Sequence, residues 1–312
     1  MFKNILFATT VTPDCDDAAN YAFDMAMKYN AKLFVFHVFG TPSRGYSQHV
    51  INVKTGERES YGEDFDKGIK EEIQTTYAEF LDQYGNVDID CMVGSPNKEI
   101  LRKVKKEGID LVIMGAHKQI KDAEALRYRN VTGDTLQKVA KSARCPLIII
   151  SRPYEKNLWE MNNILCGTDL TKASMPAFRF ALKFARENKC KLHLFHGLDI
   201  TSQPFGRAPS QVEVEENVKE AEIKIHQLYK PEMASGDDYE MIVREGIPYM
   251  EVLKYARENN VELIAMSHHT GSIFQEKEML GSTVEEVVLR SACPVASINR
   301  MNVLEGYDAF KA

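Results

Sequence analysis

The sequence contains one pattern twice, in the same order. Asn4–Thr9 (NILFAT) reappears as Asn163–Thr168 (NILCGT), and Lys32–His37 (KLFVFH) reappears as Lys191–His196 (KLHLFH). Because shared composition alone does not preserve order, we interpret the chain as a duplication in which each copy is one structural unit. Four further matches follow in sequence: Gly94-Ser95-Pro96 with Gly246-Ile247-Pro248, Asp110–Met114 with Glu262–Met266, Gly133-Asp134-Thr135 with Gly281-Ser282-Thr283, and Cys145-Pro146 with Cys293-Pro294.

The two copies predict two domains, residues 1–152 and 160–312, joined by a linker over Arg152–Trp159. A chain of 312 residues is long enough for two hydrophobic cores of ordinary size. We also expect the domains to pair within the chain as a pseudo-dimer through the apolar runs at 147–150 and 295–298, with a homodimer as a further level of assembly.

Each copy alternates short apolar runs with helical patterns. In copy one, Ile5–Thr9 is typical of a buried strand, and Thr12 and Pro13 favour the start of a helix as N-cap and first helical residue. Strands that alternate with helices predict a parallel sheet covered on both faces. The expected fold is α/β: two tandem open five-stranded parallel sheets of Rossmann-like type. The other elements predicted in copy one are strands at Lys32–Val38, up to Val93, at Leu111–Met114 and at Leu147–Ile150. Helices are predicted over about Phe65–Tyr84, from Ser95-Pro96 and from Gly133.

Charge and cysteine content exclude several classes of function. The formal net charge of −6 argues against a nucleic-acid partner, which needs clustered Lys and Arg. No apolar run approaches the roughly 20 residues that span a bilayer, and the N-terminal residues lack the layout of a signal peptide. The 6 cysteines are scattered without a C-x-x-C pair, as is typical of reduced thiols. We therefore expect a cytoplasmic protein with no membrane partner.

Ligands of open parallel sheets bind beyond the carboxyl ends of the strands, where the strand order reverses. In copy two the first strand ends next to Asp169, and the fourth strand is followed by a segment that leads to Gly281-Ser282-Thr283. Glycine lets backbone N–H groups approach a phosphate closely, and a helix that begins there favours an anion. The hydroxyl groups of Ser282 and Thr283 add donors, so this region is the candidate phosphate site.

These residues resemble the universal stress protein family, whose fourth strand leads into a G-x-x-G, nine residues, G-[ST] loop that binds ATP phosphates. Here Gly271, nine residues and Gly281-Ser282 match that loop, while Ser267 replaces the first glycine and lies one residue further from Gly271 than the family spacing. The resemblance covers nearly the whole chain, twice. It implies a non-catalytic stress-response or regulatory protein that holds ATP, with or without magnesium, in its C-terminal domain. The nucleotide-binding residues that it implies are Asp169 at the nucleoside, Gly197 beside the adenine, and Met266, Ser267, His269, Gly271, Gly281, Ser282 and Thr283 in the loop.

Copy one departs from the family at the corresponding positions. Thr10 replaces the acid, Lys118 replaces the second loop glycine, and Gly133-Asp134 replaces the G-[ST] pair. The interval from Gly115 to Gly133 is four residues longer than the interval from Ser267 to Gly281. We therefore expect a degenerate site that does not bind ATP in the same way. Copy one also carries a long segment, Gly40–Asp64, whose role the sequence does not decide.

Less specific interpretations stand beside the nucleotide site. Asp169 is also a good helix cap, and the equivalent positions of His37 and His196 favour packing or a shared hydrogen bond. Cys190, His193 and His196 suggest a metal, but strand alternation places the two histidines on opposite faces. Two other functions stay open: a slow ATP hydrolase or phosphotransferase that uses Asp169 or His269, and an interaction module that binds no nucleotide.

Overall fold

A computed structural model describes residues 1–40, 49–51, 58–60, 63–116, 133–153, 160–200, 209–267 and 282–299. The chain divides into two compact units, Met1–Tyr154 and Glu155–Ala312, and each is described by itself. No helix in the described ranges is both long enough and apolar enough to cross a membrane.

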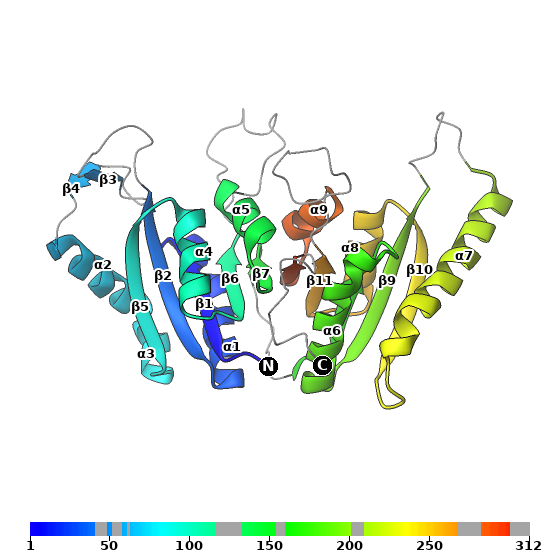
Figure 1. Ribbon diagram of the computed structural model, residues 1–312, viewed down its shortest axis with the longest axis horizontal. Coiled ribbons are helices and arrows are strands. Elements are labelled where there is room, and N and C mark those ends of the chain that lie inside the picture. Colours follow the sequence, from blue (N-terminus) through cyan, green and yellow to red (C-terminus); the bar gives the residue numbers. More distant parts are fainter. Residues whose placement is uncertain are drawn as a thin grey trace. The chain divides into compact units, whose positions relative to one another are not determined.

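Unit 1 is built on a five-stranded parallel sheet with the strand order β5-β2-β1-β6-β7. Helix α1 packs on the same face as α3, since Phe23 stacks on Phe80 with ring centroids 4.9 Å apart, while α4 and α5 pack together (Figure 1). A short antiparallel pair, β3 and β4, lies inside the predicted Gly40–Asp64 segment. The elements are β1 Asn4–Thr9, α1 Asp16–Tyr29, β2 Lys32–Gly40, β3 His49–Ile51, β4 Arg58–Ser60, α2 Glu63–Thr76, α3 Ala78–Gln83, β5 Val87–Gly94, α4 Pro96–Lys106, β6 Leu111–Gly115, α5 Asp134–Ser142 and β7 Leu147–Ile150.

Unit 2 repeats this sheet with the order β10-β9-β8-β11-β12, again parallel throughout. Helices α6 and α7 share one face, because the rings of Phe178 and Tyr229 lie 4.7 Å apart, and α8 and α9 pack together. The elements are β8 Asn163–Gly167, α6 Met175–Asn188, β9 Lys191–Asp199, α7 Gln211–Tyr229, β10 Tyr239–Gly246, α8 Pro248–Glu258, β11 Leu263–Ser267, α9 Ser282–Arg290 and β12 Val295–Ile298.

The predicted α/β class with two five-stranded parallel sheets is confirmed. In each unit the first strand pairs with the second on one side and with the fourth on the other, so β8 lies between β9 and β11. The chain therefore reverses its direction of winding next to β8, which creates the switch point where such sheets bind ligands. The central strands are buried on both faces, and Ile164, Leu165 and Cys166 have no exposed surface.

The single helix predicted over Phe65–Tyr84 was wrong. Two helices occur there, α2 and α3, and the chain leaves helical dihedral angles at Tyr77 (φ −109°, ψ 22°). The Tyr77 side chain is buried, and its hydroxyl lies 2.7 Å from Thr9 Oγ1 at the end of β1. This tertiary contact overrides a locally continuous helical pattern. The helix start predicted at Thr12 and Pro13 is a 3-10 turn, Pro13–Cys15, and α1 begins after it.

A buried aromatic residue of the second strand in unit 1 is replaced by a polar one in unit 2. Unit 1 has Phe34 there, while unit 2 has His193, which is 3% exposed. Its Nδ1 lies 2.8 Å from the Tyr255 hydroxyl and its Nε2 lies 3.0 Å from Asn163 Oδ1. Burial and the nearby Lys191 lower the pKa of His193, while Glu240 and Asp238 act in the opposite direction.

We expect this histidine to make unit 2 less stable in acid. As the pH falls through about 6.5, the unfolded chain gains a proton that the folded chain excludes, so the free energy of unfolding decreases by at most about 1.4 kcal/mol per pH unit. Burial also lowers the pKa of His196, which adds to the slope with the same sign. His193→Phe, which introduces the unit 1 residue, should flatten the slope in urea titrations between about pH 5 and pH 7. An unchanged slope would contradict this assignment.

Candidate functional site

The carboxyl ends of three neighbouring strands meet at the switch point of unit 2. In the registered pairs, Gly167 of β8 lies opposite Phe195 of β9 and Met266 of β11. Helix α9 begins at Ser282 and is the element that follows β11 in the chain. The N–H groups of its first turn have no acceptor within the helix. Of the predicted site residues, Asp169, Gly197, Met266, Ser267 and Thr283 are described. His269, Gly271, Gly281 and Lys118 lie outside the described residues, and Ser282 is described only as the first residue of α9.

Asp169 lies at the exposed end of β8, and local hydrogen bonds fix its carboxylate. Oδ1 accepts from Thr171 N at 2.9 Å, from Thr171 Oγ1 at 2.7 Å and from the Ser174 hydroxyl. The Asp169 amide in turn donates to Ser174 Oγ at 3.2 Å. The capping interpretation of Asp169 was wrong, because Thr171 is the N-cap of the 3-10 turn Lys172–Ser174 and α6 begins directly after Ser174. The bonds to Oδ1 instead hold the side chain just beyond the carboxyl end of β8.

Asp169 lies beside a strained turn that the sequence did not reveal. Leu170 has a left-handed backbone (φ 57°), which is rare for residues other than glycine. Its amide donates to Thr168 Oγ1 at 3.0 Å, and that oxygen also hydrogen-bonds the buried Tyr229 hydroxyl. His196 Nδ1 contacts the Thr168 carbonyl oxygen at 2.9 Å, so the shared hydrogen bond proposed for the strand-end histidines is present.

Unit 1 repeats this turn with different side chains around it. Val11 is left-handed (φ 58°), its amide donates to Thr9 Oγ1 at 2.9 Å, and His37 Nδ1 lies 2.8 Å from the Thr9 carbonyl oxygen. Tyr77 and Tyr229 could have been found from the repeat, because each lies 17 residues before the glycine of the Gly-x-Pro turn (Gly94, Gly246). No local pattern, however, links either tyrosine to the first strand.

Several predicted residues of unit 2 have packing roles that explain their identity. A Cβ on Gly197 would lie 2.8 Å from Pro248 Cα, so glycine is needed where α8 begins. Ser267 is buried, and its Oγ accepts from Ala177 N at 3.3 Å in the first turn of α6. Met266 packs its side chain over the glycine of β8, and Thr283 is half-buried in the first turn of α9.

The site predicted to be degenerate in unit 1 differs from the site of unit 2 in its side chains and their charge. Thr10 Oγ1 lies 2.8 Å from Thr12 Oγ1 where unit 2 has a carboxylate, and a Cβ on Gly115 would lie 3.3 Å from the Asp14 carbonyl oxygen. Gly133 is the N-cap of α5, and Asp134 follows it with its carboxylate 2.7 Å from Lys138 Nζ.

The end of the second strand is closed in unit 1 and more open in unit 2. The Phe39 ring lies edge-on to His37 with centroids 4.3 Å apart, and both side chains are 3% exposed. Phe39 also packs with Cys91. In unit 2 the corresponding His196 and Leu198 are half-buried. Among the described residues, the strand end where the sequence predicts the adenine border is therefore less buried in unit 2 than in unit 1.

Comparison with known proteins agrees with the geometry of both units. The profile of the universal stress protein family matches residues 1–151 and 160–298. The chain belongs to the universal stress protein family. A universal stress protein of Methanocaldococcus jannaschii is 26% identical over 149 residues, which cover 46% of this chain and 85% of that protein.

A solved structure of this family shows a similar fold along nearly the whole chain. A universal stress protein of Archaeoglobus fulgidus matches with a TM-score of 0.64 at 19% identity, covering 95% of this chain and 96% of its own. Another universal stress protein was solved in complex with cAMP; it covers 45% of this chain and 98% of its own, at 19% identity and a TM-score of 0.32.

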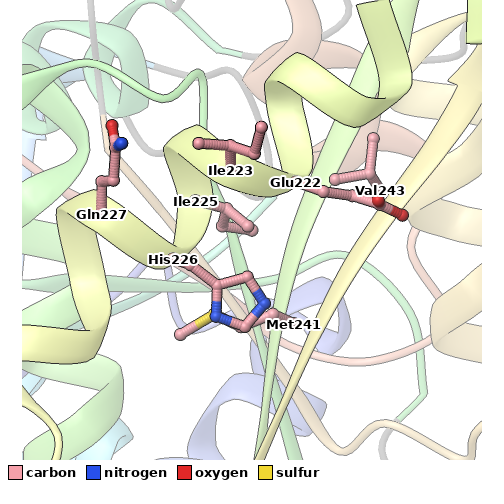
Figure 2. Close-up of a pocket in the computed structure, with 7 residues that line it drawn as sticks. All are labelled: Glu222, Ile223, Ile225, His226, Gln227, Met241 and Val243. Atoms are coloured by element: carbon pink, nitrogen blue, oxygen red, sulfur yellow. The ribbon is translucent and has the colours of Figure 1, made fainter. Parts of the chain in front are cut away.

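A separate groove of about 440 Å³ opens between α7 and β10 (Figure 2). Its lining residues are Glu222, Ile223, Ile225, His226, Gln227, Met241 and Val243. None of them is a predicted nucleotide-binding residue, and the groove runs along the edge strand instead of across the switch point. Within the described residues, no group of three His, Cys, Asp or Glu side chains is arranged to hold a metal ion.

Proposed function

We propose that unit 2 of this universal stress protein binds an adenine nucleotide, ATP with or without magnesium, and acts as a regulatory component without catalysis. The supporting observation is the junction of β8, β9 and β11 at the switch point, where Asp169 is held by three hydrogen bonds. The start of α9 supplies backbone donors for phosphate, and Asp169 supplies an acceptor for ribose hydroxyl groups.

The non-catalytic part of the proposal has its own support. In the described residues around the site, Asp169 and His196 are the groups suited to acid–base work, and both make structural hydrogen bonds. Burial lowers the pKa of His196, so its imidazole is neutral at pH 7. Its Nδ1–H donates to the Thr168 carbonyl oxygen, which fixes the orientation of the ring. A carboxylate whose Oδ1 already accepts three hydrogen bonds favours binding over hydrolysis.

Two measurements test this function. Mass spectrometry of the ligand released by denaturing the purified protein should find an adenine nucleotide, and calorimetric titration with ATP and magnesium should give a Kd tighter than about 1 mM. cAMP, the ligand of one solved relative, is titrated in parallel to define the phosphate requirement. A protein that is purified empty and binds neither nucleotide would favour the interaction module. Phosphate release that is lost in Asp169→Asn would favour the hydrolase.

A further inference from the structure

A hydrogen-bond network of polar side chains connects the core of unit 2 with Asp169. Tyr229 is fully buried at the end of α7, and its hydroxyl hydrogen-bonds Thr168 Oγ1. Ser174, which is 4% exposed, interacts with the same tyrosine hydroxyl and donates to Asp169 Oδ1. These hydrogen bonds connect α7 with Asp169, although Tyr229 lies 61 residues after Thr168 in the sequence.

This hydrogen-bond network also fixes the backbone conformation beside Asp169. The left-handed Leu170 follows Asp169 directly, and its amide is satisfied by Thr168 Oγ1, the oxygen that Tyr229 contacts. A left-handed leucine persists only where the surroundings determine its conformation. Loss of the tyrosine hydroxyl would release the threonine hydroxyl, and with it the turn that directs Asp169.

Unit 1 has the same turn without the connection to an acid. Tyr77 contacts Thr9 at 2.7 Å as Tyr229 contacts Thr168, but Cys15 stands at the position of Ser174. The Thr10 amide donates to Cys15 Sγ at 3.4 Å, in place of the bond from the Asp169 amide to Ser174. The turn occurs in both units, but the acid occurs only in unit 2. A comparison of the two units therefore distinguishes a structural role of the tyrosine from a role in ligand binding.

We propose that Ser174 and Tyr229 are positioning residues of the nucleotide site: they do not touch the ligand, but they orient the Asp169 carboxylate toward the ribose. This inference rests on the proposed function and extends it to specificity. An oriented carboxylate accepts hydrogen bonds from ribose hydroxyl groups, whereas a carboxylate held by Thr171 alone can adopt a wider range of orientations. The hydrogen-bond network therefore sets the preference for a ribonucleotide over an analogue that lacks both ribose hydroxyl groups.

The test compares the Kd of ATP with the Kd of 2′,3′-dideoxy-ATP in the full chain. We expect the wild type to prefer ATP by about tenfold or more, the factor that one or two hydrogen bonds supply. Ser174→Cys, which introduces the side chain found at Cys15, and Tyr229→Phe should reduce this preference by about tenfold and leave the Kd of dideoxy-ATP unchanged. Tyr77→Phe is the matched control, since it removes the same hydroxyl in unit 1, and it should leave both Kd values unchanged.

A second readout does not depend on the ligand. Amide exchange at Leu170 should become faster in Tyr229→Phe and stay unchanged in Tyr77→Phe, because only the first variant frees Thr168 Oγ1. An undiminished preference for ATP in folded Ser174→Cys and Tyr229→Phe would overturn the inference. Equal weakening of both nucleotides would also overturn it, because that result indicates general loosening. A wild type that binds neither nucleotide would overturn the proposed function, and this inference with it.

Discussion

Titration of the full chain with ATP and magnesium is expected to reveal one nucleotide site, which Gly281→Val removes and Gly133→Val preserves. The two glycines are equivalent in the repeat, since each immediately precedes a helix, α9 in unit 2 and α5 in unit 1. A valine side chain at Gly281 would occupy the space that a phosphate needs beside the first free N–H groups of α9. We expect the affinity to fall by at least about a hundredfold, the result of losing several charge-assisted contacts.

Charge explains why unit 1 should not provide a second site. Asp134 places a carboxylate at the start of α5, where a phosphate would bind. Two unit charges about 4 Å apart repel by roughly 4 kcal/mol at an effective dielectric near 20. The Asp134 side chain is 75% exposed and paired with Lys138, so screening reduces the penalty to about ten- to hundredfold in affinity. The missing acid at Thr10 and the Phe39 ring over the strand end remove further contacts.

The structure makes Gly133→Val a suitable control. A Cβ at Gly133 would meet no other atom within 4 Å, and the backbone there (φ −57°, ψ 141°) is one that valine adopts readily. Gly133→Val should therefore fold, and circular dichroism and thermal melting check the fold of both variants. Two equivalent sites per chain, or binding lost in Gly133→Val and kept in Gly281→Val, would contradict the predicted asymmetry.

The fold could be predicted from the sequence because its signals are local and occur twice. Apolar runs such as Ile5–Thr9 and Ile164–Thr168 are too short for helices and too uniformly apolar for surface strands, so they indicate the centre of a parallel sheet. The same order of strands and helices in both copies supports the assignment of each. The predicted strand at Leu147–Ile150 coincides with β7.

The details of the site could not be predicted, because they depend on contacts between distant residues. Tyr77 and Tyr229 reach threonines that lie 68 and 61 residues away, and neither pair leaves a local signal. Val11 and Leu170 are left-handed although their side chains disfavour that conformation. Gly197 was assigned to an adenine border, yet its contact with Pro248 alone accounts for the glycine. The pairing of the two units through their last strands stays a prediction.

Glu262→Ala is expected to destabilise unit 2 by about 3 kcal/mol, a large fraction of the stability of an ordinary domain. Glu262 is 7% exposed and precedes β11. Its Oε2 accepts from the backbone amides of Asn162 and Asn163 at 3.2 and 2.7 Å, where β8 begins. Removal of the carboxylate leaves two amide donors without their acceptor at the base of the central strand, and each such loss costs about 1–3 kcal/mol.

Asp110 makes the equivalent pair of hydrogen bonds in unit 1, where its carboxylate accepts from Lys3 N at 2.8 Å and from Asn4 N at 3.3 Å. We call this pair of bonds from one carboxylate to two successive amides the carboxylate clamp. Hydrogen exchange followed by mass spectrometry reads each unit separately, which matters because a chain of two units need not unfold in one step. Glu262→Ala should increase exchange in peptides of β8 and β11, and Asp110→Ala in peptides of β1 and β6. Glu262→Gln keeps an acceptor oxygen and should recover most of the protection. If the alanine and glutamine variants exchange alike, the carboxylate clamp does not act through these hydrogen bonds. If each alanine variant increases exchange equally in both units, the two sheets unfold as one cooperative structure. The carboxylate clamp then does not stabilise its own unit selectively.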